Sequence, residues 1–339
     1  MARIINYCVA LVFLCLFGCQ SLKAADAPQS EQIKWGNENA LNGKNETLGL
    51  FSGVLGGQIV LAGGISDGYG QWGRNVVCLS ENAGFTLYED VLSKPLAYGT
   101  SITLSDGVLC IGGRDSSQCY NEVFLITMQQ GKLNLSEDWP PLPIPLSNAA
   151  GALLDNKVYL LGGRESVSPS NLSDSFFVLD LSNKSKGWKR LPGYPGRARE
   201  NAILVVQNNG VSPCLYLLGG QTETEEGVLS CLTDGYVYNP QLERWSSLGS
   251  DFPKGVCAAV VSGANHILLF QKDQGDTLHL KKENALWKYH TITQTLIKSE
   301  LIPCTYDTMQ VLQKGHSFVI IGSNATSGTN RLYSLQGDI

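Results

Sequence analysis

The sequence lacks any run of basic residues. Its 25 Lys and Arg are outnumbered by 30 Asp and Glu, which gives a formal net charge of -5. Nucleic-acid phosphates are bound by clustered Lys and Arg. This composition argues against a nucleic-acid partner and leaves small neutral or anionic ligands open.

Cysteines at metal-binding spacing are also missing. The chain has 10 Cys but no Cys-x-x-Cys, and removing Cys8, Cys15 and Cys19 near the N-terminus leaves an odd number. Neither a metal site nor a complete disulfide framework is indicated. Cys110 and Cys214 lie in or beside apolar strands, which predicts small core residues. We expect no metal and no cofactor.

A long apolar run occurs at the N-terminus, where Val9 to Phe17 follows the basic Arg3. The run is too short to span a bilayer. Residues 1–25 are therefore predicted to be an export signal, and residues 26–339 a single domain.

Two cleavage sites compete in this segment. Leu16 to Cys19 is similar to a bacterial lipobox, in which Cys19 would be lipidated, whereas Ala24-Ala25 and Ala25-Asp26-Ala27 offer ordinary cleavage after small residues. The expected location is the periplasm or, as a lipoprotein, the outer membrane of a bacterium. A lipid anchor is the one membrane contact expected.

Glycine, in contrast, is abundant and periodic. A short apolar strand runs into a glycine pair at residues 59–64, 108–113, 158–163 and 215–220, so that successive pairs lie 49, 50 and 57 residues apart. A period near fifty is typical of the four-stranded kelch blade. Degenerate copies at 266–272 and 317–323 keep the spacing. The pattern predicts an all-β fold, a six-bladed kelch-like β-propeller.

The last blade is one strand short. Arg331 to Leu335 completes its third strand, and an open sheet edge needs a partner. Gln32 to Trp35 has the residues of an outer strand but no blade of its own. We expect this N-terminal strand to close the ring.

Several segments then carry a family resemblance. Ser175 to Leu204 resembles the first-to-second blade passage of the N-acetylneuraminate mutarotase (epimerase) family of kelch propellers, and Leu96 to Gly99 is similar to that family's Arg-Ala-Tyr-Gly. The blade order resembles that of the cyclically permuted, exported members. The resemblance implies a mutarotase acting on a small acidic sugar, with no metal or covalent intermediate, and leaves the oligomeric state open.

The resemblance does not supply the family's proton-transferring residue unchanged. It places Asn324 where the family has a catalytic Glu, and Arg331 lies one residue out of step with the family's Arg. Asn cannot exchange a proton near neutral pH. Glu200 and Tyr98 are the candidate substitutes. Alternatively the alignment slips, or the protein is a non-catalytic glycan-binding or scaffolding propeller at the cell surface.

Candidate binding residues follow the glycine pairs or begin the blades, because propeller ligands bind where such loops converge. Arg199 is the first choice to hold a carboxylate through its planar guanidinium, with Asn201 beside it. Arg164 and Arg114 are further candidates, and Trp72 could stack on a sugar. The structural alternatives are blade-to-blade salt bridges for the arginines and a loop anchor for Trp72.

Overall fold

The computed structural model describes residues 33–45, 47–66, 70–80, 84–168, 171–272, 284–303, 306, 308–323 and 331–339. Within Ile33–Ile339, which forms one compact unit, nearly all regular structure is β-strand. A single helix is described, the 3₁₀ turn η1 (Leu181–Lys186). No helix in the described ranges has the length and apolar character needed to cross a membrane.

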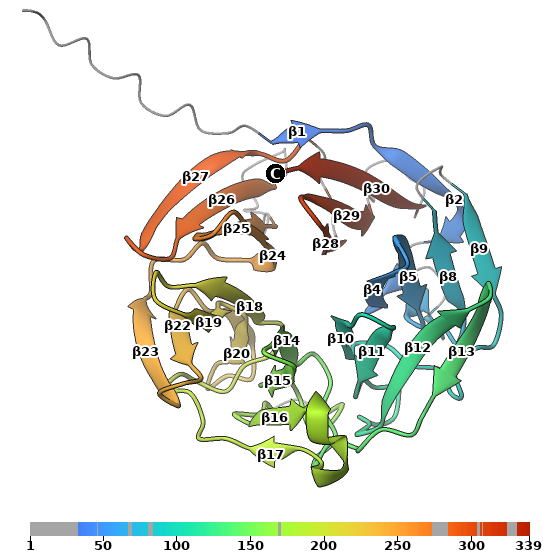
Figure 1. Ribbon diagram of the computed structural model, residues 1–339, viewed down its shortest axis with the longest axis horizontal. Coiled ribbons are helices and arrows are strands. Elements are labelled where there is room, and N and C mark those ends of the chain that lie inside the picture. Colours follow the sequence, from blue (N-terminus) through green and yellow to red (C-terminus); the bar gives the residue numbers. More distant parts are fainter. Residues whose placement is uncertain are drawn as a thin grey trace, which may run out of the picture. The chain divides into compact units, whose positions relative to one another are not determined.

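Six antiparallel sheets follow one another around a central axis, each running from an innermost to an outermost strand (Figure 1). The first three sheets are β4 (Phe51–Leu55), β5 (Gln58–Ala62), β8 (Val76–Leu79), β9 (Phe85–Tyr88); β10 (Thr100–Thr103), β11 (Val108–Ile111), β12 (Val123–Gln129), β13 (Lys132–Ser136); and β14 (Ala150–Leu154), β15 (Lys157–Leu161), β16 (Phe176–Asp180), β17 (Lys189–Arg190).

The other three sheets continue around the ring. They are β18 (Ile203–Asn208), β19 (Pro213–Leu218), β22 (Gly235–Asn239), β23 (Arg244–Gly249); β24 (Val256–Ser262), β25 (His266–Gln271), β26 (Ala285–His290), β27 (Thr295–Leu301); and β28 (Thr308–Lys314), β29 (Ser317–Ser323), β30 (Arg331–Asp338), joined by β1 (Lys34–Trp35) and β2 (Asn39–Asn45). The predicted six-bladed propeller is confirmed.

The second strand of each blade is apolar because neighbouring blades cover both of its faces. All four residues of β11 are buried, and Phe51 of the first blade packs in one cluster with Val108 and Cys110 of the second. Cys110 and Cys214 are fully buried, as predicted for small core residues.

The glycine pairs join one blade to the next. A Cβ on the first glycine would collide with a carbonyl oxygen of the following blade, Gly63 with Leu96 and Gly112 with Leu146. The N–H of the second glycine donates to that same oxygen, at 2.9 Å from Gly64 and 2.8 Å from Gly113. The pair therefore permits close backbone contact between blades.

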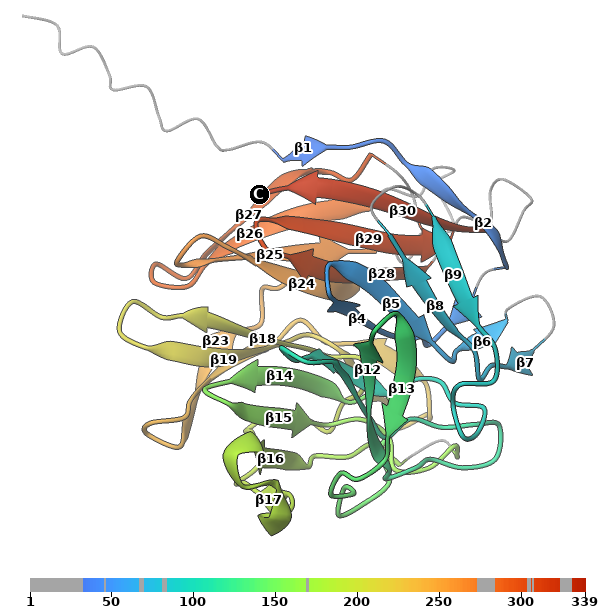
Figure 2. The same cartoon turned by 45° about the vertical axis from the view of Figure 1, so that its right-hand side comes forward.

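The N-terminal strand closes the last blade, as predicted. In β1, Lys34 and Trp35 pair with Asp338 and Gly337 of β30, and β2 continues along the same strand (Figures 1 and 2). The closing strand is longer than expected, because β2 adds seven residues to it.

Two short hairpins extend the ring beyond the repeat. After the first glycine pair, β6 (Ile65–Ser66) and β7 (Gln71–Trp72) form a sheet with β3 (Thr47–Leu48). After the fourth pair, β20 (Gln221–Glu223) pairs with β21 (Leu229–Cys231). Trp72, expected in a long loop, thus lies on a short strand.

Candidate functional site

Four residues occupy equivalent places two positions before the innermost strands of the first four blades. Gly49, Tyr98, Asn148 and Asn201 all have a left-handed backbone, with φ of 65, 59, 54 and 54°. Each N–H donates to the carbonyl of the preceding member, at 2.7 Å from Tyr98, 2.7 Å from Asn148 and 3.0 Å from Asn201. This chain of hydrogen bonds fixes one residue per blade around the centre of the ring.

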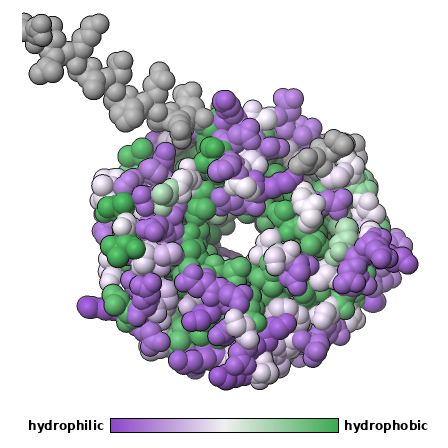
Figure 3. All heavy atoms as spheres, viewed as in Figure 1, coloured by the Kyte–Doolittle hydropathy of each residue, from purple (hydrophilic) through white to green (hydrophobic). Residues whose placement is uncertain are grey.

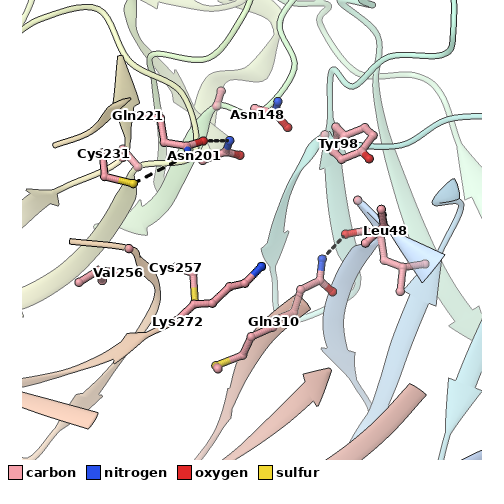
Figure 4. A pocket seen from close by; sticks show the side chains of 18 of the residues that line it. Leu48, Tyr98, Asn148, Asn201, Gln221, Cys231, Val256, Cys257, Lys272 and Gln310 are labelled. Carbon is pink, nitrogen blue, oxygen red and sulfur yellow. Dashed lines mark hydrogen bonds between the residues drawn. The ribbon is translucent and has the colours of Figure 1, made fainter. Parts of the chain in front are cut away.

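These residues line a pocket of about 600 Å³ to which all six blades contribute. Figure 3 shows that the ring is hollowed at its centre, and Figure 4 shows the side chains converging there. The volume lies within the range of small-molecule sites. The polar side chains that line it include Tyr98, Asn148, Asn201, Gln221, Lys272 and Gln310.

Lys272 is the one charged side chain among the described lining residues. It directly follows β25, and Gln271 and Lys272 together take the two positions of the glycine pair of the first four blades. Its backbone N–H donates to Gly255 O at 3.0 Å, and its side chain extends into the pocket (Figure 4). The loss of the glycine in the fifth blade therefore places a cation where it can bind a carboxylate.

Tyr98 and Asn201, two of the predicted site residues, lie in this pocket. Glu200 does not line it. Its side chain is 3% exposed and accepts hydrogen bonds from Arg164 Nε at 3.1 Å, Arg164 Nη2 at 2.8 Å and Asn148 Nδ2 at 2.8 Å. The contact between Arg164 and Glu200 is a blade-to-blade salt bridge, the structural alternative for this arginine.

Arg114 and Trp72 support Tyr98 from outside the pocket. The Arg114 guanidinium lies 4.7 Å from the centroid of the Tyr98 ring and 5.3 Å from that of Trp72, and the two rings are 6.1 Å apart, edge to face. Neither residue is part of the pocket lining. Trp72 is thus placed as an anchor for Tyr98 rather than as a platform for a sugar.

Arg199, the first choice for a substrate carboxylate, lies inside the fold instead. Its side chain is 0% exposed, Nη1 and Nη2 donate to the Asp234 carboxylate at 2.7 and 2.8 Å, and Nη1 also donates to Gly219 O at 2.9 Å. Its Nε also donates to Arg197 O at 3.1 Å, so every nitrogen of the guanidinium donates to a protein acceptor. A direct contact with a ligand in the pocket is therefore contradicted by its burial.

Two further predicted residues cannot be placed in the site. Arg331 begins β30, where its backbone pairs with Asn45, but its side chain lies outside the described residues. Asn324 also lies outside them.

Lys272, Asn148 and Gln310 were not predicted. Asn148 could have been found by aligning the residues that begin each blade, since it takes the place of Tyr98 and Asn201. Lys272 occupies the position of a lost glycine, and in the sequence this loss indicates only a degenerate copy of the repeat, not a binding residue. Gln310 has no local sequence signal, because it meets the other lining residues through ring closure alone.

Two thiols line the pocket, those of Cys231 and Cys257. Burial raises the pKa of Cys257 to about 11, so its thiol is protonated at neutral pH. The described residues contain no group of His, Cys, Asp and Glu placed to hold a metal ion.

Fold and pocket define a six-bladed propeller with a pocket of small-molecule size at the centre of its ring. Comparison with known sequences agrees with the family resemblance: the N-acetylneuraminate epimerase family matches residues 139–276. This stretch includes Asn148, Asn201, Gln221 and Lys272.

Individual relatives give the same result. The chain is 28% identical over 155 residues to N-acetylneuraminate epimerase of Yersinia pestis strain Pestoides F, covering 44% of this chain and 37% of that protein. It is 31% identical over 131 residues to the Haemophilus influenzae strain PittEE protein of the same name, covering 39% and 32%. The match thus spans about a third of the length of these curated relatives.

Proposed function

We propose that this protein is a mutarotase that interconverts the anomers of N-acetylneuraminate or a related acidic sugar. The observation that carries the proposal is a pocket of neutral polar side chains with one cation, Lys272, in the segment that matches the epimerase family. One cation suits a ligand with one carboxylate. The neutral amides suit its hydroxyl groups.

Mutarotation opens a hemiketal ring and closes it on the other face. One group must take the proton of the anomeric hydroxyl, and another must protonate the ring oxygen. We assign one of these transfers to Tyr98, because it lines the pocket in a left-handed conformation that is costly for a bulky residue. Glu200 is not assigned such a role, since Arg164 and Asn148 occupy its carboxylate.

The assignment of Tyr98 is tested by Tyr98→Phe, with anomer exchange followed by NMR directly after enzymatic release of the sugar. We expect the rate to fall about 10²- to 10⁴-fold, the usual contribution of general acid–base catalysis, while calorimetric affinity stays within about threefold. Tyr88→Phe is the control, because the Tyr88 hydroxyl contacts Gly131 O outside the pocket. Unchanged exchange in Tyr98→Phe would refute the assignment, and binding without exchange in the wild type would identify a glycan-binding propeller instead.

We also propose that the protein is exported, on the basis of Arg3 and the apolar run Val9 to Phe17. Fractionation of producing cells should find it outside the cytoplasm. Incorporation of labelled fatty acid that is lost in Cys19→Ala would show lipidation; export without label would favour cleavage at the alanines.

A further inference from the structure

Three side-chain amides in the pocket wall use their nitrogen atoms for contacts within the protein. Asn148 Nδ2 donates to Glu200 Oε2 at 2.8 Å, Asn201 Nδ2 donates to Gln221 Oε1 at 3.2 Å, and Gln310 Nε2 donates to Leu50 O at 2.8 Å. All three residues line the pocket. Their carbonyl oxygens are thereby left for other partners.

Gln310 gives the clearest case. Its Oε1 is buried and has no hydrogen-bond partner among the described residues, while its nitrogen must face Leu50 O, which can only accept. A buried oxygen without a partner costs about 1–3 kcal/mol. A ligand that donates a hydrogen bond at this point would remove that cost.

Asn148 is oriented through Glu200. The Glu200 carboxylate only accepts hydrogen bonds, so the Asn148 amide must turn its nitrogen towards it. Arg164 fixes that carboxylate with two hydrogen bonds, of 3.1 and 2.8 Å. Glu200 is thus a positioning residue, which acts on the pocket through the amide of Asn148.

Asn201 repeats this arrangement one blade further. Its nitrogen donates to Gln221 Oε1, whose own nitrogen is directed at Cys231 Sγ, 3.9 Å away. In Figure 4, Asn201 and Gln221 lie together on the wall opposite Gln310.

We infer that Asn148 Oδ1, Asn201 Oδ1 and Gln310 Oε1 form an acceptor subsite that recognises the hydroxyl donors of a polyhydroxylated ligand. Lys272 adds the site for its single carboxylate. The inference rests on the proposed function for the identity of the ligand, but it concerns binding and not proton transfer.

The test uses glycine at the left-handed positions, because Gly49 shows that the propeller accepts it there, with φ of 65°. Asn148→Gly and Asn201→Gly should each weaken calorimetric binding of N-acetylneuraminate about tenfold, the loss of about one hydrogen bond. Asn156→Gly is the matched control: Asn156 is also left-handed, with φ 58°, but lies in the β14–β15 turn outside the pocket. The Asn156→Gly variant should bind N-acetylneuraminate with the same affinity as the wild type.

Glu200→Ala and Glu200→Gln together test the positioning role. In Glu200→Gln an oxygen should stay at the place of Oε2, because that atom accepts from both Arg164 Nε and Asn148 Nδ2, whereas Oε1 accepts from Arg164 alone. Affinity should stay within about threefold of the wild type in Glu200→Gln and fall about tenfold in Glu200→Ala, where the Asn148 amide has lost its acceptor. Equal affinities in the two variants, with both proteins shown by their urea transitions to be folded, would overturn the assignment.

Anomer exchange is measured in parallel on the same samples. Loss of affinity in both glycine variants with no exchange in any sample would support the subsite while the mutarotase proposal fails. Exchange by the wild type with unchanged affinity in Asn148→Gly and Asn201→Gly would overturn the subsite alone. Absence of sugar binding by the wild type would overturn both.

Discussion

At the residue scale, the pocket depends on what stands at one repeated left-handed position. A left-handed backbone carries no steric penalty for Gly and is tolerated by Asn, whose side chain is short. For Tyr98 the same backbone conformation is unfavourable, because its side chain is bulky. The backbone bonds between Gly49, Tyr98 and Asn148 hold the position in place whatever its side chain. The repeat can therefore change its ligand chemistry without changing its fold.

Lys272→Met tests the proposed carboxylate contact. Affinity for N-acetylneuraminate should fall about 10- to 100-fold, because hydrogen bonds to charged groups contribute about 1.5–3 kcal/mol. Affinity for an analogue without the carboxylate should not change. Calorimetry checks both values, with Lys254→Met, an exposed site outside the pocket, as control. An equal loss for both sugars would contradict the contact.

Arg199→Met should affect stability rather than binding. Removing one partner of a buried ion pair typically costs about 3–5 kcal/mol. The control, Arg190→Met, breaks an exposed pair with Asp174, whose side chains are 63% and 73% exposed, and should cost below about 1 kcal/mol. Urea unfolding measures both; similar midpoints for the two variants would refute the structural role of Arg199.

The ion pair between Arg199 and Asp234 predicts that the fold loses stability at acidic pH. Burial alone would raise the pKa of Asp234, but the hydrogen bonds and charge of Arg199 outweigh it and hold the pKa below its ordinary value. The stabilisation is therefore complete above about pH 4, the ordinary pKa, and is lost as the pH falls through the lower folded value. Urea unfolding of the wild type and Asp234→Asn should differ at pH 7 and converge towards pH 3. A constant difference would contradict this.

At the element scale, the last blade depends on residues from the opposite end of the chain. Trp35 of β1 contacts Phe318 with ring centroids 5.6 Å apart, and its Nε1 donates to Glu300 Oε2 of β27 at 3.1 Å. The closing strand therefore ties the sixth blade to the outer strand of the fifth. Without it, β30 would present an open edge.

Trp35→Ala should lower the free energy of unfolding by about 2–3 kcal/mol, less than for a fully buried Trp because the side chain is half-buried. Trp35→Phe keeps a ring but loses the hydrogen bond, and should cost about 1 kcal/mol. Glu300→Ala removes the acceptor of that hydrogen bond, and combined with Trp35→Phe it should cost less than the sum of the two single changes. If the losses in unfolding free energy simply add, Trp35 and Glu300 do not interact. A wild-type urea midpoint in Trp35→Ala would refute closure by this strand.

Prediction from the sequence succeeded where elements carry a local pattern. The glycine pairs at 63–64 and 112–113 mark blade contacts that must recur at every interface, and Trp35 has the character of an outer strand. The hairpins β6–β7 and β20–β21 were not predicted, because each occurs in one blade only. Their short strands give no periodicity.

At the scale of the whole molecule, the site is a product of ring closure. Tyr98 and Gln310 face one pocket although they lie 212 positions apart in the chain, so no local pattern could have joined them. Arg199 was misplaced for the same reason, since its partner Asp234 reaches it through blade packing. The segment that carries the family resemblance contributes Asn201 to the pocket lining and Glu200 behind it.

The central claim is that this pocket catalyses exchange between sugar anomers. Its most direct test is NMR of N-acetylneuraminate just after enzymatic release, with and without the purified wild-type protein at neutral pH. The account predicts equilibration well above the buffer rate, in proportion to protein concentration. Equilibration at the buffer rate, with protein shown by its unfolding transition to be folded, would contradict it.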